Sequence, residues 1–280
     1  MSNAFNTLKE SVASYGNSLH KFVANGMVLY RADSLVLMRR ILDKYPNGCF
    51  DMIFVDPPYF LSNGGFSCQN GQMVSVDKGA WDKSRGLAAD MEFYEEWLSL
   101  CYALLKPNGT IWVCGTFHNI YLIGYLMQTL GYHILNNITW EKPNPPPNLS
   151  CRFFTHSTET LLWAKKNKKA KHTFHYQLMK ETNHNKQMKS VWQFTPPLSS
   201  EKLLGKHPTQ KPLSLVERCI LAASNPADLV FDPFMGSGTT GATAIKHQRY
   251  FCGCDINDGY FELAKRRLLD IEKNTGNNHV

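Results

Sequence analysis

Four consecutive residues, Asp56-Pro57-Pro58-Tyr59, place a carboxylate and an aromatic ring together after an apolar run. The run, residues 50–55, is typical of a buried strand, and the two prolines fix the backbone and remove two N–H donors. The neighbouring carbonyl groups therefore stay available as acceptors. This combination suits a flat heterocycle that carries an amine, such as a nucleobase that has left its stack. The alternative is an ordinary turn after a strand.

A second transition from strand to turn lies far downstream. The apolar residues 229–231 lead through Asp232 into Phe234-Met235-Gly236-Ser237-Gly238, and Thr239 and Thr240 then open a helix. Glycines let the backbone approach a ligand closely, and a helix N-terminus offers unpaired N–H groups. The turn lacks both the lysine of a P-loop and the three-glycine Rossmann spacing. It suits a small anionic or zwitterionic ligand, or it is only a tight turn.

Asp255 ends the next apolar strand, residues 249–255. An acid in this position, after a glycine turn and a helix, is how α/β folds hold the hydroxyl groups of a ribose. Asp255 could instead cap the helix that we expect to begin near Asp258. The context favours the ribose.

In this order, the motifs resemble the S-adenosylmethionine-dependent DNA amino methyltransferases of the β class, in which the catalytic motif precedes the cofactor motif. The resemblance runs from about Val28 to Leu268, and further matching pieces are Tyr30–Asp33, Leu104–Gly109 and His207–Pro212. It implies an α/β fold with a doubly wound, mostly parallel, Rossmann-like sheet of seven strands. One strand would be antiparallel, and an insert would recognise DNA.

The resemblance implies that Asp56 and the Pro57 carbonyl accept the two N6 hydrogens of a flipped adenine that stacks on Tyr59. The nitrogen lone pair would then point at the methyl group, so positioning and electrostatics would supply the catalysis. Pro58 completes the motif. Phe60 or Phe154 would add an apolar wall.

The cofactor implied by the resemblance is S-adenosylmethionine, placed over the glycine turn. Asp33 would lie near its adenine amine, Asp255 at its ribose, and Lys211 with Thr240 near its methionine carboxylate. The other cofactor-binding residues of the turn would be Asp232, Phe234, Gly236, Gly238 and Thr239.

The sequence leaves alternatives for the target base and for the kind of nucleic acid. Cytosine N4 methylation uses the same amine chemistry, and Asp in place of Ser at the first motif position favours adenine by family habit. A catalytically inactive DNA-binding specificity protein is disfavoured by the intact motifs, and RNA is a further candidate substrate. The segments that resemble the subgroup methylating adenine in GATC, within restriction–modification systems, are residues 60–65, 74–79, 81–82, 137–140 and 148–152. We therefore expect GATC, unless these segments only shape a lid.

A basic segment interrupts the alternation of strands and helices between residues 165 and 205. Its lysines Lys165, Lys166, Lys168, Lys169 and Lys171 precede scattered histidines and aromatic residues. A charge run is usually a solvated face. Beside a methyltransferase core we interpret it as the target-recognition insert, in which lysines contact phosphates. The histidine spacing fits no zinc template, so we expect no metal.

The remaining sequence predicts one domain, residues 1–280, with a loop at residues 61–91 that we expect to be a mobile lid. Helices are expected at about residues 34–44, 92–105 and 119–130, and strands at 27–30, 110–114, 133–140 and 158–164. This alternation is typical of a doubly wound sheet.

The composition fits an intracellular DNA-acting protein. The net charge of +7 agrees with a polyanionic partner. The chain has no Cys-x-x-Cys pair, no signal core and no membrane-length apolar run, so we expect reduced thiols and a cytoplasmic location. The expected partners are DNA and a cognate restriction endonuclease without a stable complex, and the chain could form a homodimer.

Overall fold

The structure is a computed structural model that describes residues 5–6, 8, 19–62, 66–69, 72–75 and 78–276. Parts of the predicted loop and of the segments that resemble the GATC subgroup, residues 63–65, 70–71 and 76–77, lie outside the described residues. The strands are β1 (His20–Ala24), β2 (Met27–Arg31), β3 (Phe50–Val55), β4 (Phe66–Gln69), β5 (Gln72–Ser75), β6 (Leu105–Gly115), β7 (His133–Glu141), β8 (Thr158–Lys165), β9 (Val191–Gln193), β10 (Leu229–Asp232) and β11 (Tyr250–Asp255).

Helices connect these strands almost throughout. They are α2 (Ser34–Lys44), α3 (Leu87–Leu104), α4 (Ile120–Thr129), α5 (Tyr176–Glu181), α6 (Leu213–Ala223), α7 (Thr239–Lys246) and α8 (Asp258–Gly276), with 3-10 turns η1 (Ala80–Asp82) and η2 (Ser199–Lys202). In the described part of the chain, none of these helices is both long and apolar enough to cross a membrane.

The main sheet has the order β1-β2-β11-β10-β3-β6-β8-β7-β9. The strands from β2 to β7 in this order form the predicted seven-stranded sheet, in which β8 alone runs antiparallel to its neighbours β6 and β7. The structure adds β1, antiparallel to β2, and β9, parallel to β7. Neither edge strand was predicted, because both are short and partly exposed.

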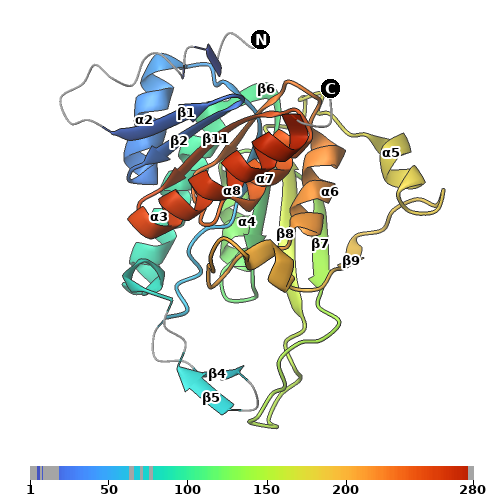
Figure 1. Cartoon of the computed structure of the whole chain (residues 1–280). Helices are drawn as coiled ribbons and strands as arrows, with labels where there is room; N and C mark the ends of the chain where they lie inside the picture. The colour runs from blue at the N-terminus through green and yellow to red at the C-terminus, as the bar shows by residue number, and fades with distance from the viewer. Residues whose placement is uncertain are drawn as a thin grey trace.

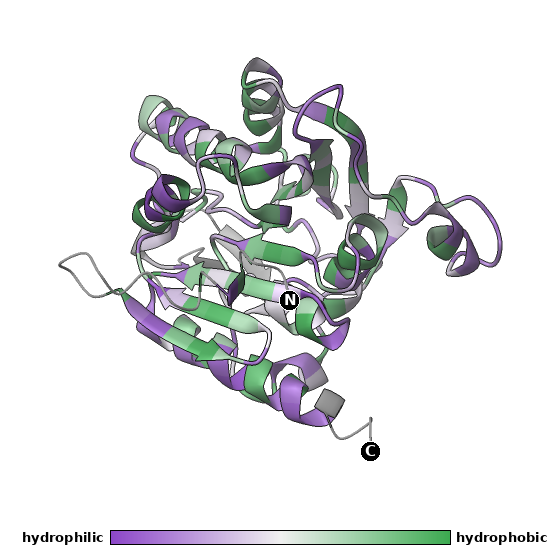
Figure 2. Ribbon diagram, turned by 90° about the horizontal axis from the view of Figure 1, so that it is seen from above, coloured by the Kyte–Doolittle hydropathy of each residue, from purple (hydrophilic) through white to green (hydrophobic). Residues whose placement is uncertain are grey.

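Helices cover both faces of this sheet (Figure 1). One core joins the sheet to α2, α3 and α4, and the other joins it to α6, α7 and α8. Figure 2 shows hydrophobic strands in the middle of the molecule, while the helices on either side carry hydrophilic residues. The apolar runs that suggested buried strands are therefore buried from both sides, as parallel sheets require.

Helix α3 begins at Leu87, so the predicted loop ends five residues earlier than we expected. The apolar residues of this first turn, Leu87 and Met91, are exposed and do not pack into the core. Instead, the Asp90 carboxylate fastens this turn by accepting hydrogen bonds from the Ser84 hydroxyl and the Arg85 N–H.

The parallel strands all finish at one edge of the sheet, which we call the carboxyl edge; we call the opposite edge the amino edge. Strand β8 begins at the carboxyl edge with Thr158 and ends at the amino edge with Lys165, because Thr160 pairs with Gly115 and Lys165 pairs with Thr110. The β4–β5 hairpin and the loop of residues 142–157 both project from the carboxyl edge (Figure 1).

Candidate active site

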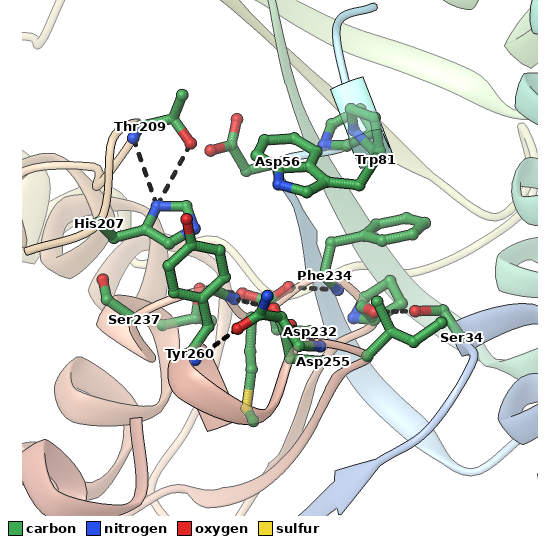
Figure 3. Close-up of a pocket in the computed structure, with 18 of the residues that line it drawn as sticks. Ser34, Asp56, Trp81, His207, Thr209, Asp232, Phe234, Ser237, Asp255 and Tyr260 are labelled. Atoms are coloured by element: carbon green, nitrogen blue, oxygen red, sulfur yellow. Dashed lines mark hydrogen bonds between the residues drawn. The ribbon is translucent and has the colours of Figure 1, made fainter. Parts of the chain in front are cut away.

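The two predicted motifs meet at the carboxyl edge because their strands are neighbours. Strands β3 and β10 are parallel, with Ile53 opposite Phe231, so the turns that follow them open into one cavity of about 250 Å³. Asp56 and Asp232 both line this cavity. Figure 3 shows Asp56 beside Trp81 on one side, with Asp232 and Asp255 across from them.

Asp56 is held by two donors from its own chain. The Lys211 ammonium lies 2.6 Å from one carboxylate oxygen, and the Tyr59 hydroxyl donates to the other at 2.8 Å. The Lys211 side chain is only 7% exposed, so this ion pair is shielded from water. The sequence resemblance placed Lys211 near the cofactor carboxylate; in the structure its ammonium pairs with the Asp56 carboxylate.

A second carboxylate, Glu159 at the start of β8, completes this cluster. It lies 3.6 Å from the Lys211 ammonium, accepts from the Tyr59 hydroxyl at 3.4 Å, and pairs with Lys142 at 2.5 Å. Sequence reasoning missed Glu159 because no local motif marks it. Only the antiparallel direction of β8 brings the residue to the carboxyl edge.

The charges of this cluster are mutually dependent. Burial works to lower the pKa of Lys211, but Asp56 and Glu159 outweigh it, so the pKa of Lys211 is raised. Burial works to raise the pKa of Glu159, but Lys211 and Lys142 outweigh it, so the pKa of Glu159 is lowered. Burial raises the pKa of Asp56, and the Lys211 ammonium opposes that rise. The lysine thus favours the ionised form of Asp56, as a nearby opposite charge does.

Asp82 anchors the turn that follows β3. This buried carboxylate accepts hydrogen bonds from the backbone N–H groups of Tyr59 at 3.1 Å, Phe60 at 2.9 Å and Leu61 at 3.3 Å, and from the Ser62 hydroxyl at 2.8 Å. Successive N–H groups that converge on one anion fix a turn firmly. Asp82 thereby fixes the backbone that presents Tyr59.

The glycine turn after β10 depends on two residues with positive φ, +49° at Gly236 and +78° at Gly238. We had expected both glycines to let a ligand approach. A Cβ atom on Gly236 would indeed point toward the cavity, 3.0 Å from His207. A Cβ on Gly238 would lie 2.7 Å from Leu268 of α8, so Gly238 permits close packing of that helix.

Asp232 and Asp255 flank this turn without a cation. The Asp232 carboxylate accepts from the Thr240 hydroxyl at 2.6 Å and the Phe234 N–H at 3.0 Å. Burial raises the pKa of Asp232 to about 7 and that of Asp255 to about 6. Among the described residues, neither carboxylate takes part in an ion pair. Two such groups facing one cavity suit a cationic ligand.

The cap of α8 is Asn257, whose side chain accepts from the Tyr260 N–H at 3.1 Å. Asp255 therefore does not cap that helix. Its two carboxylate oxygens accept from the N–H groups of Gly236 and Asn257, which orients the side chain at the cavity wall. The cap residue of α2 is Asp33, which also lines the cavity and accepts from the Val36 N–H at 3.0 Å.

The rings of Trp81, His207 and Tyr260, for which the sequence predicted no role in cofactor binding, also line the cavity. The His207 ring lies against both others, with centroid distances of 6.4 Å to Trp81 and 4.2 Å to Tyr260. Burial, with help from the charge of Lys211, lowers the pKa of His207 to about 4. His207 is therefore neutral at physiological pH. The fold brings His207 together with Trp81 and Tyr260, which lie far from it in the sequence.

Three further residues of the predicted cofactor set, Phe234, Thr239 and Thr240, line the cavity, and both threonine hydroxyl groups are hydrogen-bonded within the chain. Phe234 lines the cavity and contacts Phe93 and Trp97. Thr240 donates to Asp232, and Thr239 accepts a 3.4 Å hydrogen bond from Arg267.

The predicted DNA-contacting lysines do not join this site. Lys165 ends β8 at the amino edge, opposite the cavity. Its ammonium donates to the Ala170 carbonyl at 3.0 Å, and that of Lys166 donates to the Leu105 carbonyl at 2.6 Å. These two ammonium groups are therefore bound to backbone carbonyl groups of the chain at the amino edge. In the described part of the chain, no group of three or more His, Cys, Asp or Glu side chains could hold a metal ion.

Comparisons with known proteins agree with this geometry. A family model described as DNA methylase, the N6/N4 family, matches residues 50–266. The chain is 50% identical over 265 residues to the type II methyltransferase M2.DpnII of Streptococcus pneumoniae, covering 93% of this chain and 97% of that protein. It is 54% identical over 242 residues to M2.LlaDCHI of Lactococcus lactis subsp. cremoris, covering 86% and 88% of the two chains.

Solved structures support the same assignment. The M1.HpyAVI–SAM complex superposes with a TM-score of 0.66 at 30% identity, covering 86% of this chain and 98% of that one. The cytosine-N4-specific PvuII DNA methyltransferase has a TM-score of 0.69 at 18% identity, covering 94% and 96%, and shows a shared fold. The chain therefore belongs to the N6/N4 DNA methylase family and is a site-specific DNA methyltransferase that uses S-adenosylmethionine.

Proposed function

We propose that this protein methylates the N6 atom of adenine in the DNA sequence GATC. The observation that carries the proposal is the joining of the two turns in one cavity, with Asp56 and Tyr59 at one end and the uncompensated carboxylates Asp232 and Asp255 at the other. The target base would occupy the first end and the cofactor the second.

The residues of the catalytic turn would act by positioning. The adenine N6 is a poor nucleophile because its lone pair is conjugated with the ring. When the Asp56 carboxylate and the Pro57 carbonyl accept its two hydrogens, the nitrogen moves toward tetrahedral geometry and its lone pair points along the axis of transfer. After transfer, N6 carries a positive charge and releases one proton, for which the Asp56 carboxylate is the nearest base.

Lys211 and Glu159 would set the charge of Asp56. Lys211 favours the carboxylate form, which alone can accept both a substrate N–H and, later, the released proton. Glu159 lies close to the Lys211 ammonium as a second carboxylate, and it also accepts a hydrogen bond from the Tyr59 hydroxyl. We infer that Lys211 serves the catalytic carboxylate and not the cofactor.

The residues around the glycine turn fit S-adenosylmethionine. When bound, this cofactor supplies a methyl group on a sulfonium, and it also carries an ammonium, a ribose diol and an adenine. Asp232 offers a negative charge at the turn, Asp255 offers acceptors suited to the diol, and Phe234 offers an apolar face. Asp33, whose position at the α2 cap is fixed, would accept from the adenine amine.

GATC is supported by the sequence resemblance of five segments and by the close similarity to type II methyltransferases. The test is to incubate the protein with plasmid and cofactor, then digest with an endonuclease that is blocked by adenine methylation at GATC and with an insensitive one that cuts the same sequence. Protection from the first alone supports the proposal. If the methylation-sensitive endonuclease still cuts the plasmid completely while methyl groups are incorporated elsewhere, GATC is not the recognition sequence.

Nucleoside analysis of the same plasmid separates the proposed product from that of the alternative reaction. The expected product is N6-methyladenine. N4-methylcytosine as the main product would show that the target base is cytosine. The proposed roles of the fold and of the catalytic turn would then stay the same. An RNA substrate treated in parallel tests the remaining alternative.

Two surfaces compete as the DNA-binding face. The lysine run lies at the amino edge, whereas the exposed cations Lys83, Arg85 and Arg152 lie in loops at the carboxyl edge. Each phosphate contact that is lost flattens the slope of log K against log salt by about one unit. We propose that replacing Lys83, Arg85 and Arg152 by Gln flattens the slope more than replacing Lys168, Lys169 and Lys171. The opposite result would restore the lysine run as the DNA face.

We also propose that a cognate endonuclease shares the recognition sequence without forming a stable complex, and that the methyltransferase can form a homodimer. Size-exclusion chromatography with light scattering, with and without DNA, tests the oligomeric state.

A further inference from the structure

An exposed cluster of rings lies at the carboxyl edge, outside the cavity. The Phe117 ring stacks on His156 at a centroid distance of 4.7 Å, and Phe153 lies 5.4 Å from the same histidine. Phe117 is 48% exposed and Phe153 is 59% exposed, although both are large apolar side chains. They come from two separate segments, the turn after β6 and the loop of residues 142–157, so the fold assembles them.

Lys78 lies beside the turn that carries Tyr59. Its ammonium lies 5.7 Å from the centroid of the Tyr59 ring and 3.9 Å from the Asp82 carboxylate. Burial lowers the pKa of His118, the neighbour of Phe117, and the charges of His156 and Lys78 add to this effect. Lys78 therefore lies beside the ring on which the target base would stack, and its charge is felt at His118 next to the exposed cluster.

The charges around the cluster suit a polyanion. The loops at this edge, residues 78–86, 116–119 and 142–157, contain a single acid, Asp82. That carboxylate is buried and bound by the catalytic turn, so it adds little negative charge to the surface. The exposed charged side chains of the same segments are Lys83, Arg85 and Arg152.

We propose that Phe117, His156 and Phe153 form a stacking surface for a base that neighbours the target adenine in the same DNA strand. The proposal rests on the proposed function, because the target base must enter the cavity from this edge. Rings with exposed faces bind bases by stacking, and nearby cations hold the connecting phosphates. Lys78, beside the Tyr59 ring, would contact the phosphate that links the target nucleotide to its neighbour.

The test is a double-mutant cycle between protein and DNA. The variant Phe117→Leu/Phe153→Leu keeps apolar volume but removes both ring faces. Binding is measured by fluorescence anisotropy on a duplex with one GATC, and on duplexes with an abasic site at each of the two nucleotides on either side of the target adenine. Stacking on an aromatic ring is worth about 1–3 kcal/mol per base, so we expect the variant to bind intact DNA on the order of tenfold more weakly.

The coupling between the two changes decides the question. At one abasic position, the wild-type protein should lose on the order of tenfold in affinity while the variant loses little more than it has already lost. Equal losses for both proteins at every position would overturn the proposal, as would a variant that binds intact DNA like the wild type. Each single substitution is measured as well, so that a poorly folded double variant leaves two informative proteins.

Two controls separate this result from others. The variant Tyr125→Leu removes a ring that is 61% exposed on α4, outside the cluster, and should bind like the wild type. The thermal shift with S-adenosylmethionine should be unchanged in all variants. If the wild-type protein methylates adenine but shows no coupling, the stacking surface alone is wrong; if it does not methylate adenine, the proposed function is wrong.

Discussion

The sequence uses the dipeptide Asp-Pro twice, at the ends of the neighbouring strands β3 and β10, and the structure gives the two aspartates opposite environments. Asp56 has an ammonium 2.6 Å away and a tyrosine hydroxyl on its other oxygen. Asp232 has only a threonine hydroxyl and a backbone N–H, and burial raises its pKa to about 7.

The difference shows that the partner decides the role of a carboxylate. Lys211 compensates the charge of Asp56 within the chain, so Asp56 can stay ionised and accept hydrogen bonds from a neutral amine. The charge of Asp232 has no such compensation, so it favours a ligand that brings its own positive charge. One turn is thereby suited to the target base and the other to the cofactor.

The largest effect should come from Asp56→Ala. Methyl transfer should fall on the order of a hundredfold or more, because one electrostatic contact to the reacting group is removed. Cofactor affinity should change little, since Asp56 lies at the other end of the cavity. The measurement is single-turnover incorporation of labelled methyl groups, with Asp270→Ala on the exposed face of α8 as the control. Near-normal turnover would contradict the comparison.

Lys211→Met should erase the difference between the two turns. Without the ammonium, the buried Asp56 carboxylate loses its ion-pair partner, while Glu159 beside it keeps only Lys142. Removing one partner of a buried ion pair typically costs about 3–5 kcal/mol of unfolding free energy. The pKa of Asp56 should rise, so the acid limb of the pH–activity profile should move to higher pH. Thermal denaturation and the pH profile measure these effects, and a variant that matches the wild type in both would show that Lys211 serves another group.

A smaller loss is expected from Asp82→Asn, which changes only the anchor of the catalytic turn. The amide keeps one carbonyl acceptor but loses the charge that holds three N–H groups. Hydrogen bonds to a charged group contribute about 1.5–3 kcal/mol each, so turnover should fall on the order of tenfold while cofactor affinity stays constant. Stopped-flow base-flipping measurements with 2-aminopurine should show a less ordered target base. Equal effects on cofactor and base would mean that Asp82 supports the whole cavity.

The smallest effect concerns pH. Binding of a cationic cofactor requires ionised Asp232, whose pKa is about 7, so the affinity of the wild-type protein should fall by about tenfold between pH 8 and pH 6. The sign for stability is opposite: because the folded pKa lies above the unfolded value of about 3.9, the ligand-free protein should lose stability as pH rises from about 4 to 7. Asp232→Asn should weaken both dependences. Cofactor affinity independent of pH in the wild type would contradict this account.

The sequence predicted elements whose chemistry is local. Helix α2 and strand β3 have the expected boundaries, because a capping aspartate and an apolar run mark them. The two motifs also meet in one cavity, since parallel neighbouring strands end at the same edge.

The site residues that the sequence did not predict come from segments far from the two motifs in the chain. Glu159 reaches the site because β8 is antiparallel, and Asp82 does so because the chain returns after the β4–β5 hairpin. The lysine run depends on long-range placement in the same way, and its role as a DNA surface stays a prediction. Its charge density suggested a DNA surface, but charge alone does not reveal the edge of the sheet, and β8 carries the run away from the cavity.

The most direct test of the division between the two turns is a calorimetric titration of S-adenosylmethionine into Asp56→Asn and Asp232→Asn at pH 8. Both substitutions remove one buried negative charge from the same cavity and preserve side-chain shape. The account predicts an affinity close to that of the wild type for Asp56→Asn and a loss on the order of tenfold or more for Asp232→Asn, since the latter removes a charge-assisted contact. Equal losses in the two variants, or a greater loss for Asp56→Asn, would contradict it.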